Sequence, residues 1–282
     1  MSIASGFPRA EPSQCGSGSR PAAHGRALSH AGRVVKMTAL LGSIPATGLA
    51  QVPDELPFAV GERMTYHVKV GRFGSGRGTM WIEGPVDVRG TPTYLLRSEM
   101  RARVGFVRAN DVAESWLDPV RMATLRYHKR EQRAFGGGEE QVELFPTEHR
   151  WEEKGGAVGE SPTDDPLDEL SFIYFVRTLP LADDSVFRVV RHYDRERNPI
   201  EVRVVGRDTI ATDAGVFPSI VVEMRVKDPQ RYQGTGTIRL HLSDDARRIP
   251  VRVESSVPVV GRAVLTLATY TPAPARLVLR PF

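Results

Sequence analysis

Histidine side chains are the first candidates for chemistry in this sequence, because imidazole serves as a general base and as a metal ligand. Five of them follow residue 50, namely His67, His128, His149, His192 and His241. No two of the five stand at i, i+2 or i, i+4, and no HExxH motif occurs. Three of them, His67, His128 and His241, fall in segments of alternating polarity, mostly on the polar side. We predict solvated strand positions for these three, and no metal site.

Two further patterns contain groups that act elsewhere as acids, cation ligands or nucleophiles. SDDARR (243–248) combines acids with arginines, but it is also the pattern of a hairpin turn that leads into an exposed strand face. Ser75 in GSGRG matches neither the G-x-S-x-G elbow nor a phosphate-binding P-loop, and we predict a hairpin turn there. The single cysteine is Cys15, which excludes a cysteine nucleophile and multi-thiolate zinc sites from the rest of the chain. We therefore predict a protein that is not an enzyme, with no catalytic residue and no cofactor.

The element around which these groups are arranged is DPLDELSFIYFVRTL (165–179), which predicts a helix. Asp165 suits the N-cap and Pro166 suits the first helical position. The residues that follow are apolar on nearly every side, which is typical of a buried helix. Three aromatic side chains of this segment are candidate ligand contacts: Phe172, Tyr174 and Phe175. They either line a slot for an acyl chain or apolar peptide, or simply fill the core.

Segments on both sides of this helix alternate apolar and polar side chains with the period of β-strands. In GERMTYHVKV (61–70), for example, every second side chain from Met64 to Val70 is apolar. Gly and Pro punctuate roughly a dozen such segments, and residues 152–165 form a polar loop before the helix. We predict a single, mainly β domain over residues 57–270: a highly curved antiparallel sheet, or open β-barrel, around the buried helix. A two-sheet β-sandwich is the alternative architecture.

The first fifty residues differ from the rest in charge and composition. They carry five basic residues and one acid, so the remaining 33 basic and 33 acidic residues balance. A balanced body lacks the electrostatic footprint of a nucleic-acid binder. Residues 33–50 have the basic start, apolar middle and small final residues of a signal peptide, with cleavage expected between Ala50 and Gln51. Residues 1–36 are then either a disordered extension or sequence upstream of a start at Met37.

This leader predicts an exported protein of the periplasm or cell envelope. No later segment is apolar over a length that would span a bilayer as a helix. The chain finishes in a Pro-rich tail at 271–282.

Four segments, taken in order, carry a resemblance to a known family. They are FAVGERMTYHVKVGRFGSGRGTMWIEG (58–84), DPLDELSFIYFVRTLPL (165–181), GRDTIATDAGVFPSIVVE (206–223) and LHLSDDARRIPVRVESSVPVVGRAVLTLATY (240–270). In this combination they resemble a bacterial envelope family named domain of unknown function 3108, over residues 57–270. The resemblance implies an exported, mostly antiparallel β protein without an assigned catalytic residue.

We expect a non-enzymatic envelope protein that binds or carries an apolar ligand, or a lipidated or unfolded client. Two other functions stay open: a structural or assembly factor that pairs through a sheet edge, and a hydrolase whose site is dispersed along the chain. The expected partners are a lipid, another apolar ligand or an envelope protein, and nucleic acid is not among them.

Overall fold

The computed structural model describes residues 56–133, 136–228, 234–257 and 261–274, which belong to one compact unit. The predicted extension at 1–36, the signal peptide at 33–50 with its cleavage site, and residues 275–282 of the tail lie outside the described residues. Within the described part, no helix is long and apolar enough to cross a membrane.

Fourteen strands form one continuous sheet in the described part of the chain. The first eight are β1 (Arg63–Val70), β2 (Gly74–Val88), β3 (Thr91–Val104), β4 (Val107–Asp118), β5 (Ala123–Arg133), β6 (Gly136–Phe145), β7 (Arg150–Glu153) and β8 (Val158–Glu160). The other six are β9 (Val186–Val189), β10 (Ile200–Thr212), β11 (Gly215–Asp228), β12 (Gly234–Ser243), β13 (Pro250–Val257) and β14 (Gly261–Thr271). One α-helix, α1 (Glu169–Val176), and two 3₁₀ turns, η1 (Pro146–Glu148) and η2 (Arg195–Arg197), complete these elements.

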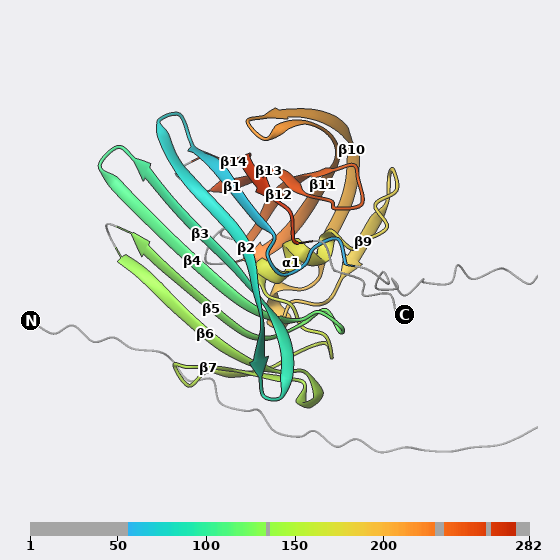
Figure 1. Ribbon diagram of the computed structural model, residues 1–282. Coiled ribbons are helices and arrows are strands. Elements are labelled where there is room, and N and C mark those ends of the chain that lie inside the picture. The colour runs from blue at the N-terminus through green and yellow to red at the C-terminus, as the bar shows by residue number, and fades with distance from the viewer. Residues whose placement is uncertain (1–55, 134–135, 229–233, 258–260, 275–282) are drawn as a thin grey trace, which may run out of the picture. The chain divides into compact units, whose positions relative to one another are not determined.

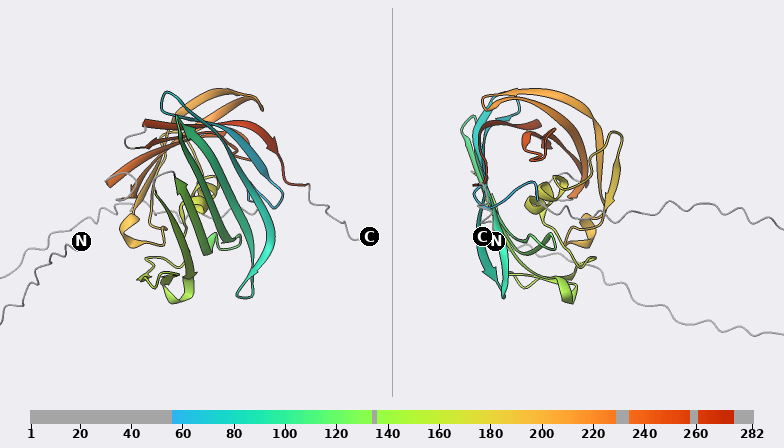
Figure 2. Two further views of the ribbon diagram at one scale, coloured as in Figure 1. Left: turned by 90° about the vertical axis from the view of Figure 1, so that its left-hand side faces the viewer. Right: turned by 45° about the vertical axis from the view of Figure 1, so that its right-hand side comes forward.

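The order of strands in the sheet is β8-β7-β6-β5-β4-β3-β2-β1-β14-β13-β12-β11-β10-β9, and every neighbouring pair is antiparallel. Pairing of β1 with β14 joins the two halves of the chain, so β8 and β9 are the two edges, and they are not paired with each other in this order. The sheet curls around α1, which lies in the connection between the two edge strands (Figure 1, Figure 2). The predicted curved, open antiparallel sheet with one helix is confirmed. The two-sheet sandwich is wrong, because one hydrogen-bonded order contains all fourteen strands.

The helix is shorter than the predicted 165–179, and its N-cap is Asp168 rather than Asp165. The Oδ1 atom of Asp168 accepts hydrogen bonds from the backbone N–H groups of Leu170 (2.7 Å) and Ser171 (3.0 Å). The Ser171 hydroxyl in turn accepts from the Asp168 N–H at 2.9 Å, which completes a capping box.

A tertiary contact explains why the helix begins late. The N–H of Leu167 donates to the carbonyl of Arg191 at 2.6 Å, and the Leu167 carbonyl accepts from Tyr193 at 3.0 Å. This isolated bridge holds Leu167 in extended pairing, so the helix starts only after it. The sequence pattern pointed to Asp165 as the cap, and this contact between distant segments moves the helix start to Asp168.

Part of the predicted loop at 152–165 is sheet. Strand β7 and strand β8 occupy Arg150–Glu153 and Val158–Glu160. Trp151 of β7 is paired with Leu144 of β6, and its ring meets that of Tyr193 edge-on at 5.7 Å. A short strand is thus stabilised by one aromatic contact in a segment whose composition is otherwise that of a loop.

Ser75 lies in strand β2 rather than in a hairpin turn, which corrects the prediction. The turn is confined to residues 71–73, and β2 begins at Gly74. Gly76 serves close strand packing, because a Cβ added there would lie 2.1 Å from the carbonyl oxygen of Arg101. Gly76, one of the glycines that suggested a turn, therefore allows the close approach of β3 to β2.

The core lies between α1 and the concave side of the sheet, and six of the eight residues of the helix are buried. Strands from both halves of the chain supply the rest, including Met64, Tyr66, Leu96, Leu117, Val204, Val222, Leu240 and Leu267. The prediction that sheet from both sides of the helix would cover it is confirmed.

A buried ion pair holds the C-terminal end of α1. The guanidinium of Arg177 donates to both carboxylate oxygens of Glu62, at 2.7 and 2.9 Å, and both side chains are buried. The same guanidinium donates to the carbonyls of Pro57 at 3.0 Å and Arg247 at 2.9 Å. One side chain thereby ties together the helix end, the segment before β1 and the β12–β13 turn.

Candidate functional site

The inner face of the sheet is the side that packs on α1, and strand register extends this face beyond the helix. Leu96 of β3 is buried beside the helix, and Ser98 and Met100 continue the same side of that strand. Their register partners on β4 are Ala113 and Asp111. All four of these side chains are partly exposed. The inner face is therefore filled near α1 and accessible to solvent toward the β1–β2 and β3–β4 turns.

The half of the accessible inner face that β11 to β14 form is mainly apolar, with Ser255 of β13 opposite Ile238 as a polar exception. Val226, Ile238 and Leu265 are partly exposed there. Each lies two positions from a buried core residue of its own strand, respectively Met224, Leu240 and Leu267. We call these three partly exposed residues, together with Met100 of β3 on the same face, the apolar wall. A surface of this kind favours hydrocarbon over water.

The opposite half of the inner face carries charges. Asp111 of β4 is opposite Glu131 of β5, and Lys129 of β5 is opposite Glu140 of β6. The ammonium of Lys129 lies 3.5 Å from a carboxylate oxygen of Glu131. We call these four residues the polar stripe. It continues the same side of β5 as the buried Tyr127, so the charges face the concave interior.

The polar stripe meets the first turn of α1 at Glu169. An ion pair with Arg197 engages Oε1 of Glu169, and the Tyr127 hydroxyl hydrogen-bonds to the same carboxylate. Burial alone would raise the pKa of Glu169, but the positive charges of Lys129 and Arg197 outweigh it and hold the pKa well below its usual range. Glu169 is thus an ionised group at the boundary between the filled and the accessible parts of the inner face.

Glu140 behaves in the opposite way. Burial, and after it the negative charge of Glu169, raise the pKa of Glu140, while a hydrogen bond donated by the Tyr193 hydroxyl opposes this shift. Two carboxylates with pKa values displaced in opposite directions therefore lie close together.

His192 adds a buried donor to this cluster. Its Nδ1 accepts a hydrogen bond from the N–H of Asp194 at 3.0 Å, and its ring centroid lies 4.6 Å from that of Tyr193. Burial lowers the pKa of His192 to about 4, so the ring is neutral and its proton is on Nε2. Among the described residues, that buried Nε2 has no hydrogen-bond partner. It is therefore a buried donor beside the polar stripe, without an acceptor in the described part of the protein.

Acidification should lower the free energy of unfolding, because His192 is held neutral in the folded protein. Because its pKa is about 4 in the folded protein against 6.5 for an ordinary histidine, the unfolded chain takes up the proton first. Stability is therefore complete above pH 6.5 and falls as the pH drops toward 4, by on the order of 3 kcal/mol. Urea denaturation across this pH range should show a shallower slope for His192→Phe than for the wild type. An unchanged slope would contradict the assignment, and His67→Gln, at an exposed histidine, is the control.

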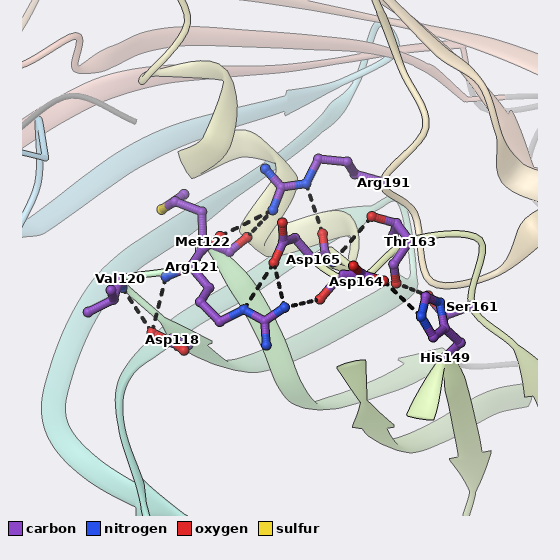
Figure 3. Close-up of polar contacts among 10 residues, drawn as sticks. All are labelled: Asp118, Val120, Arg121, Met122, His149, Ser161, Thr163, Asp164, Asp165 and Arg191. Atoms are coloured by element: carbon purple, nitrogen blue, oxygen red, sulfur yellow. Dashed lines mark hydrogen bonds and ion pairs between the residues drawn. The ribbon is translucent and has the colours of Figure 1, made fainter. Parts of the chain in front are cut away.

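Two arginines position the loop that leads into α1 (Figure 3). Arg121 donates to the Asp165 carboxylate at 3.2 Å and to the Asp164 carbonyl at 2.8 Å. Arg191 donates to the Asp165 carbonyl at 2.8 Å and to the Met122 carbonyl at 2.6 Å. Asp165, predicted as the helix cap, instead anchors this loop to the β4–β5 turn.

The cap itself is bonded to the sheet. The Oδ2 atom of Asp168 accepts from the hydroxyls of Ser115 on β4 at 2.5 Å and Thr124 on β5 at 2.8 Å. Burial raises the pKa of Asp168, and these hydrogen bonds oppose that shift. The start of α1, and with it Glu169, is thus fixed over β4 and β5.

The three predicted ligand contacts on α1 lie in the core. Phe172, Tyr174 and Phe175 are 3%, 0% and 7% exposed. Tyr174 meets Phe58 edge-on at 5.0 Å, and the rings of Phe172 and Phe175 are 5.8 Å apart. These side chains fill the space between helix and sheet, and none is among the partly exposed residues of the inner face. Their contact with a ligand stays a prediction.

The structure does not bring the five histidines together. His67 bonds to Asp213 at 2.7 Å on the exposed side of β1, and His128 lies between Glu114 and Glu139, so both are on the polar side as predicted. Among the described side chains, no group of three His, Cys, Asp or Glu residues could hold a metal ion.

His241 is not solvated, which corrects the prediction. It is on the polar side of β12 but is buried, with Asp208 of β10 at 3.8 Å from its Nδ1. Burial lowers the pKa of His241, and the charge of Arg252 on the neighbouring strand adds to this shift. The alternation of β12 alone did not reveal that other residues cover its outer side.

The predicted turn at 243–248 is confirmed. Oδ1 of Asp245 accepts from the N–H groups of Arg247 at 3.0 Å and Arg248 at 3.2 Å, and Asp244 pairs with Arg207. The acids and arginines of this segment therefore stabilise a turn.

Sequence reasoning missed the polar stripe and the residues beside it. A signal existed for Lys129 and Glu131, because they continue the alternating side of β5 that contains the apolar Tyr127. No local signal pointed to Glu169 or His192, which meet only through the packing of α1 against the segment before η2.

Comparisons with known proteins agree with this architecture. A family model described as "Protein of unknown function (DUF3108)" matches residues 65–268. No curated protein sequence matches the chain. Among solved structures, a β-barrel-like protein of domain of unknown function DUF1849 from Brucella abortus has a TM-score of 0.55 at 10% sequence identity, covering 77% of this chain and 99% of that one. This likeness shows a shared fold.

Two further structures match less well. A "putative lipoprotein" from Parabacteroides distasonis has a TM-score of 0.29 at 9% identity, covering 77% of this chain and 97% of that one. A "putative exported protein" from Bacteroides fragilis has a TM-score of 0.28 at 10% identity, covering 77% and 98% of the two chains.

Proposed function

This chain belongs to the DUF3108 family, and we propose that it is an exported, non-enzymatic binding protein whose inner sheet face holds an amphiphilic molecule. The observation that carries the proposal is the division of the accessible inner face into an apolar wall and a polar stripe. An acyl chain or other hydrocarbon packs on the wall, and its polar head lies toward Lys129, Glu140 and His192.

The burial pattern supports this site in preference to the helix aromatics. Around α1 the inner-face side chains are buried, whereas Met100, Ile238 and Leu265 are partly exposed on the same face. Apolar residues on a concave, partly exposed surface flanked by a few oriented polar groups are typical of small-molecule sites. The signal-peptide pattern at 33–50 supports export, which would place the protein where envelope lipids are accessible.

The proposal is tested by titrating delipidated protein with a dansyl-labelled fatty acid and following its fluorescence. We expect saturable uptake by the wild type, and about tenfold weaker affinity for Leu265→Glu and Ile238→Glu, because each places a charge on the apolar wall. The control is Val216→Glu, at an exposed position near the β10–β11 turn, which should bind like the wild type.

Thermal unfolding of all variants must first show that they fold. Absence of saturable uptake by the wild type, or equal affinity for the wall variants and the control, would overturn the proposal. Extraction of a lipid from protein purified out of envelope fractions would strengthen it and identify the head group.

The two other functions stay predictions. The edge strands available to an assembly partner are β8 and β9, of three and four residues, and so offer few free backbone groups. A hydrolase would need a hydroxyl nucleophile. The buried hydroxyls of Ser115, Thr124 and Ser171 are instead bonded to the capping carboxylate of Asp168.

A further inference from the structure

Two hairpin tips present phenylalanine rings to solvent. Phe73, in the β1–β2 turn, is 85% exposed, and Phe106, in the β3–β4 turn, is 97% exposed. Val107, next to the second ring, is also exposed. Large apolar side chains in this position contribute nothing to the core, and leaving them in water is unfavourable.

All the charged residues close to these two rings in the sequence are basic. Residues 69–77 and 100–110 contain Lys69, Arg72, Arg77, Arg101, Arg103 and Arg108, and no aspartate or glutamate. Arg101 forms an ion pair with Glu99. Within the described part of the chain, Lys69, Arg72, Arg77 and Arg108 form no ion pair.

Register places these cations side by side. Arg77 of β2 is directly opposite Arg101 of β3, and Arg103 of β3 is directly opposite Arg108 of β4. Like charges opposite each other across strands are unfavourable unless an anion neutralises them. The two tips lie next to each other at one end of the sheet (Figure 1). It is the end toward which the inner face becomes accessible.

We propose that the β1–β2 and β3–β4 hairpin tips dock the protein on the surface of an anionic lipid bilayer. The rings of Phe73 and Phe106 enter the boundary between head groups and acyl chains, and the six cations bind lipid phosphates around them. A combination of basic residues with exposed aromatic rings is typical of an interfacial membrane contact. A soluble polyanion would satisfy the arginines but would leave both rings in water.

This docking goes beyond amphiphile binding and does not depend on it. It would bring the accessible end of the inner face to the bilayer, so that a lipid could pass between membrane and protein. The contribution of each cation near an anionic leaflet is about 1 kcal/mol, so two substitutions should weaken binding about thirtyfold. Removing both rings should weaken it about a hundredfold, at roughly tenfold for each partly buried ring.

The test is co-sedimentation of the full chain with vesicles of phosphatidylcholine containing phosphatidylglycerol, and with vesicles of phosphatidylcholine alone. We expect binding only to the anionic vesicles, decreasing with salt because exposed charges are screened. The double variants Phe73→Ser/Phe106→Ser and Arg77→Gln/Arg103→Gln should bind more weakly by the factors above. Every protein carries the same residues 1–50, so any contribution of the leader cancels between variants.

Matched controls remove similar groups elsewhere. Val158→Ser deletes an exposed apolar side chain on β8, and Arg188→Gln/Arg203→Gln deletes two exposed arginines on β9 and β10. Both should bind vesicles like the wild type. A second readout is tryptophan fluorescence of Phe106→Trp, which should be quenched by brominated lipid in anionic vesicles, whereas that of Val158→Trp should not.

Equal vesicle binding by the ring variant and the wild type would overturn the proposal, as would the absence of quenching in Phe106→Trp. Binding to heparin as tight as to anionic vesicles, with no effect of the ring substitutions, would identify a polyanion site instead. Uptake of the dansyl-labelled fatty acid is measured without vesicles. Failure of the membrane-docking proposal therefore leaves the proposal of amphiphile binding untouched, and the reverse also holds.

Discussion

Replacing Phe172 with aspartate is expected to abolish cooperative folding. The side chain is 3% exposed and packs against Phe175 inside the space between α1 and the sheet. Loss of the ring costs about 3–5 kcal/mol, and a carboxylate buried without a cation adds several kcal/mol more. The sum is comparable with the whole stability of a domain, about 5–15 kcal/mol. Near-ultraviolet circular dichroism should show no cooperative thermal transition.

Two further variants separate the effect of the buried position from the effect of the introduced side chain. Phe172→Leu keeps an apolar side chain and should cost only about 1–2 kcal/mol. Phe106→Asp makes the same change of side chain at an exposed tip and should leave the melting temperature unaltered. A Phe172→Asp protein that melts like the wild type would mean that α1 is exposed in solution, which would contradict the fold.

Arg177→Met is expected to destabilise the protein by about 3–5 kcal/mol, because it leaves the Glu62 carboxylate buried without its cation. Both carboxylate oxygens of Glu62 are bonded by the guanidinium, at 2.7 and 2.9 Å. Two backbone carbonyls, of Pro57 and Arg247, lose their donor in the same substitution. For a domain of this size the melting temperature should fall by on the order of 10 °C, measured by calorimetry.

The double variant Arg177→Met/Glu62→Leu tests the cause. With both charges removed, no uncompensated ion remains, and much of the stability should return. Arg203→Met, in an exposed ion pair with Glu201, should change stability by less than about 1 kcal/mol. If the double variant is no more stable than Arg177→Met, the cost lies in packing of the long side chain rather than in the buried charge.

The two ends of α1 are therefore held in different ways, and both bear on the proposed site. Asp168 joins the start of the helix to β4 and β5 through Ser115 and Thr124, and Arg177 joins its end to Glu62. Together they set how far the helix extends over the inner face. That position separates the filled core from the apolar wall and polar stripe, so a shift of α1 would change the proposed binding surface directly.

Much of the fold was predictable from local pattern. The alternation from Met64 to Val70 assigned the buried side of β1 correctly, since side chains of a strand alternate between two faces. An apolar segment without a polar side predicted the buried helix, and its aromatic residues are in the core. The basic excess of residues 1–50 and the balanced charge of the remaining residues were evident from the sequence alone.

What local pattern could not supply is the partner of each residue. Asp165 and Asp168 are equivalent as capping residues, and only the pairing of Leu167 with the chain at Arg191 and Tyr193 selects Asp168. Periodicity places a side chain on a face but does not say what covers that face. Periodicity therefore could not predict that His241 is buried or that Met100 is partly exposed, although both lie in regular strands.

By itself, the sequence determined the balance of charge, the faces of most strands and the buried character of the helix, because these depend on composition and on contacts between near neighbours in the chain. The tertiary structure alone decided that Glu169, His192 and Glu140 form one electrostatic cluster, and that Arg177 meets Glu62 across 115 residues. It also decided where the inner face stays accessible. The physical reason is that these contacts are set by the pairing of β1 with β14 and by the curvature of one sheet, which no short segment encodes.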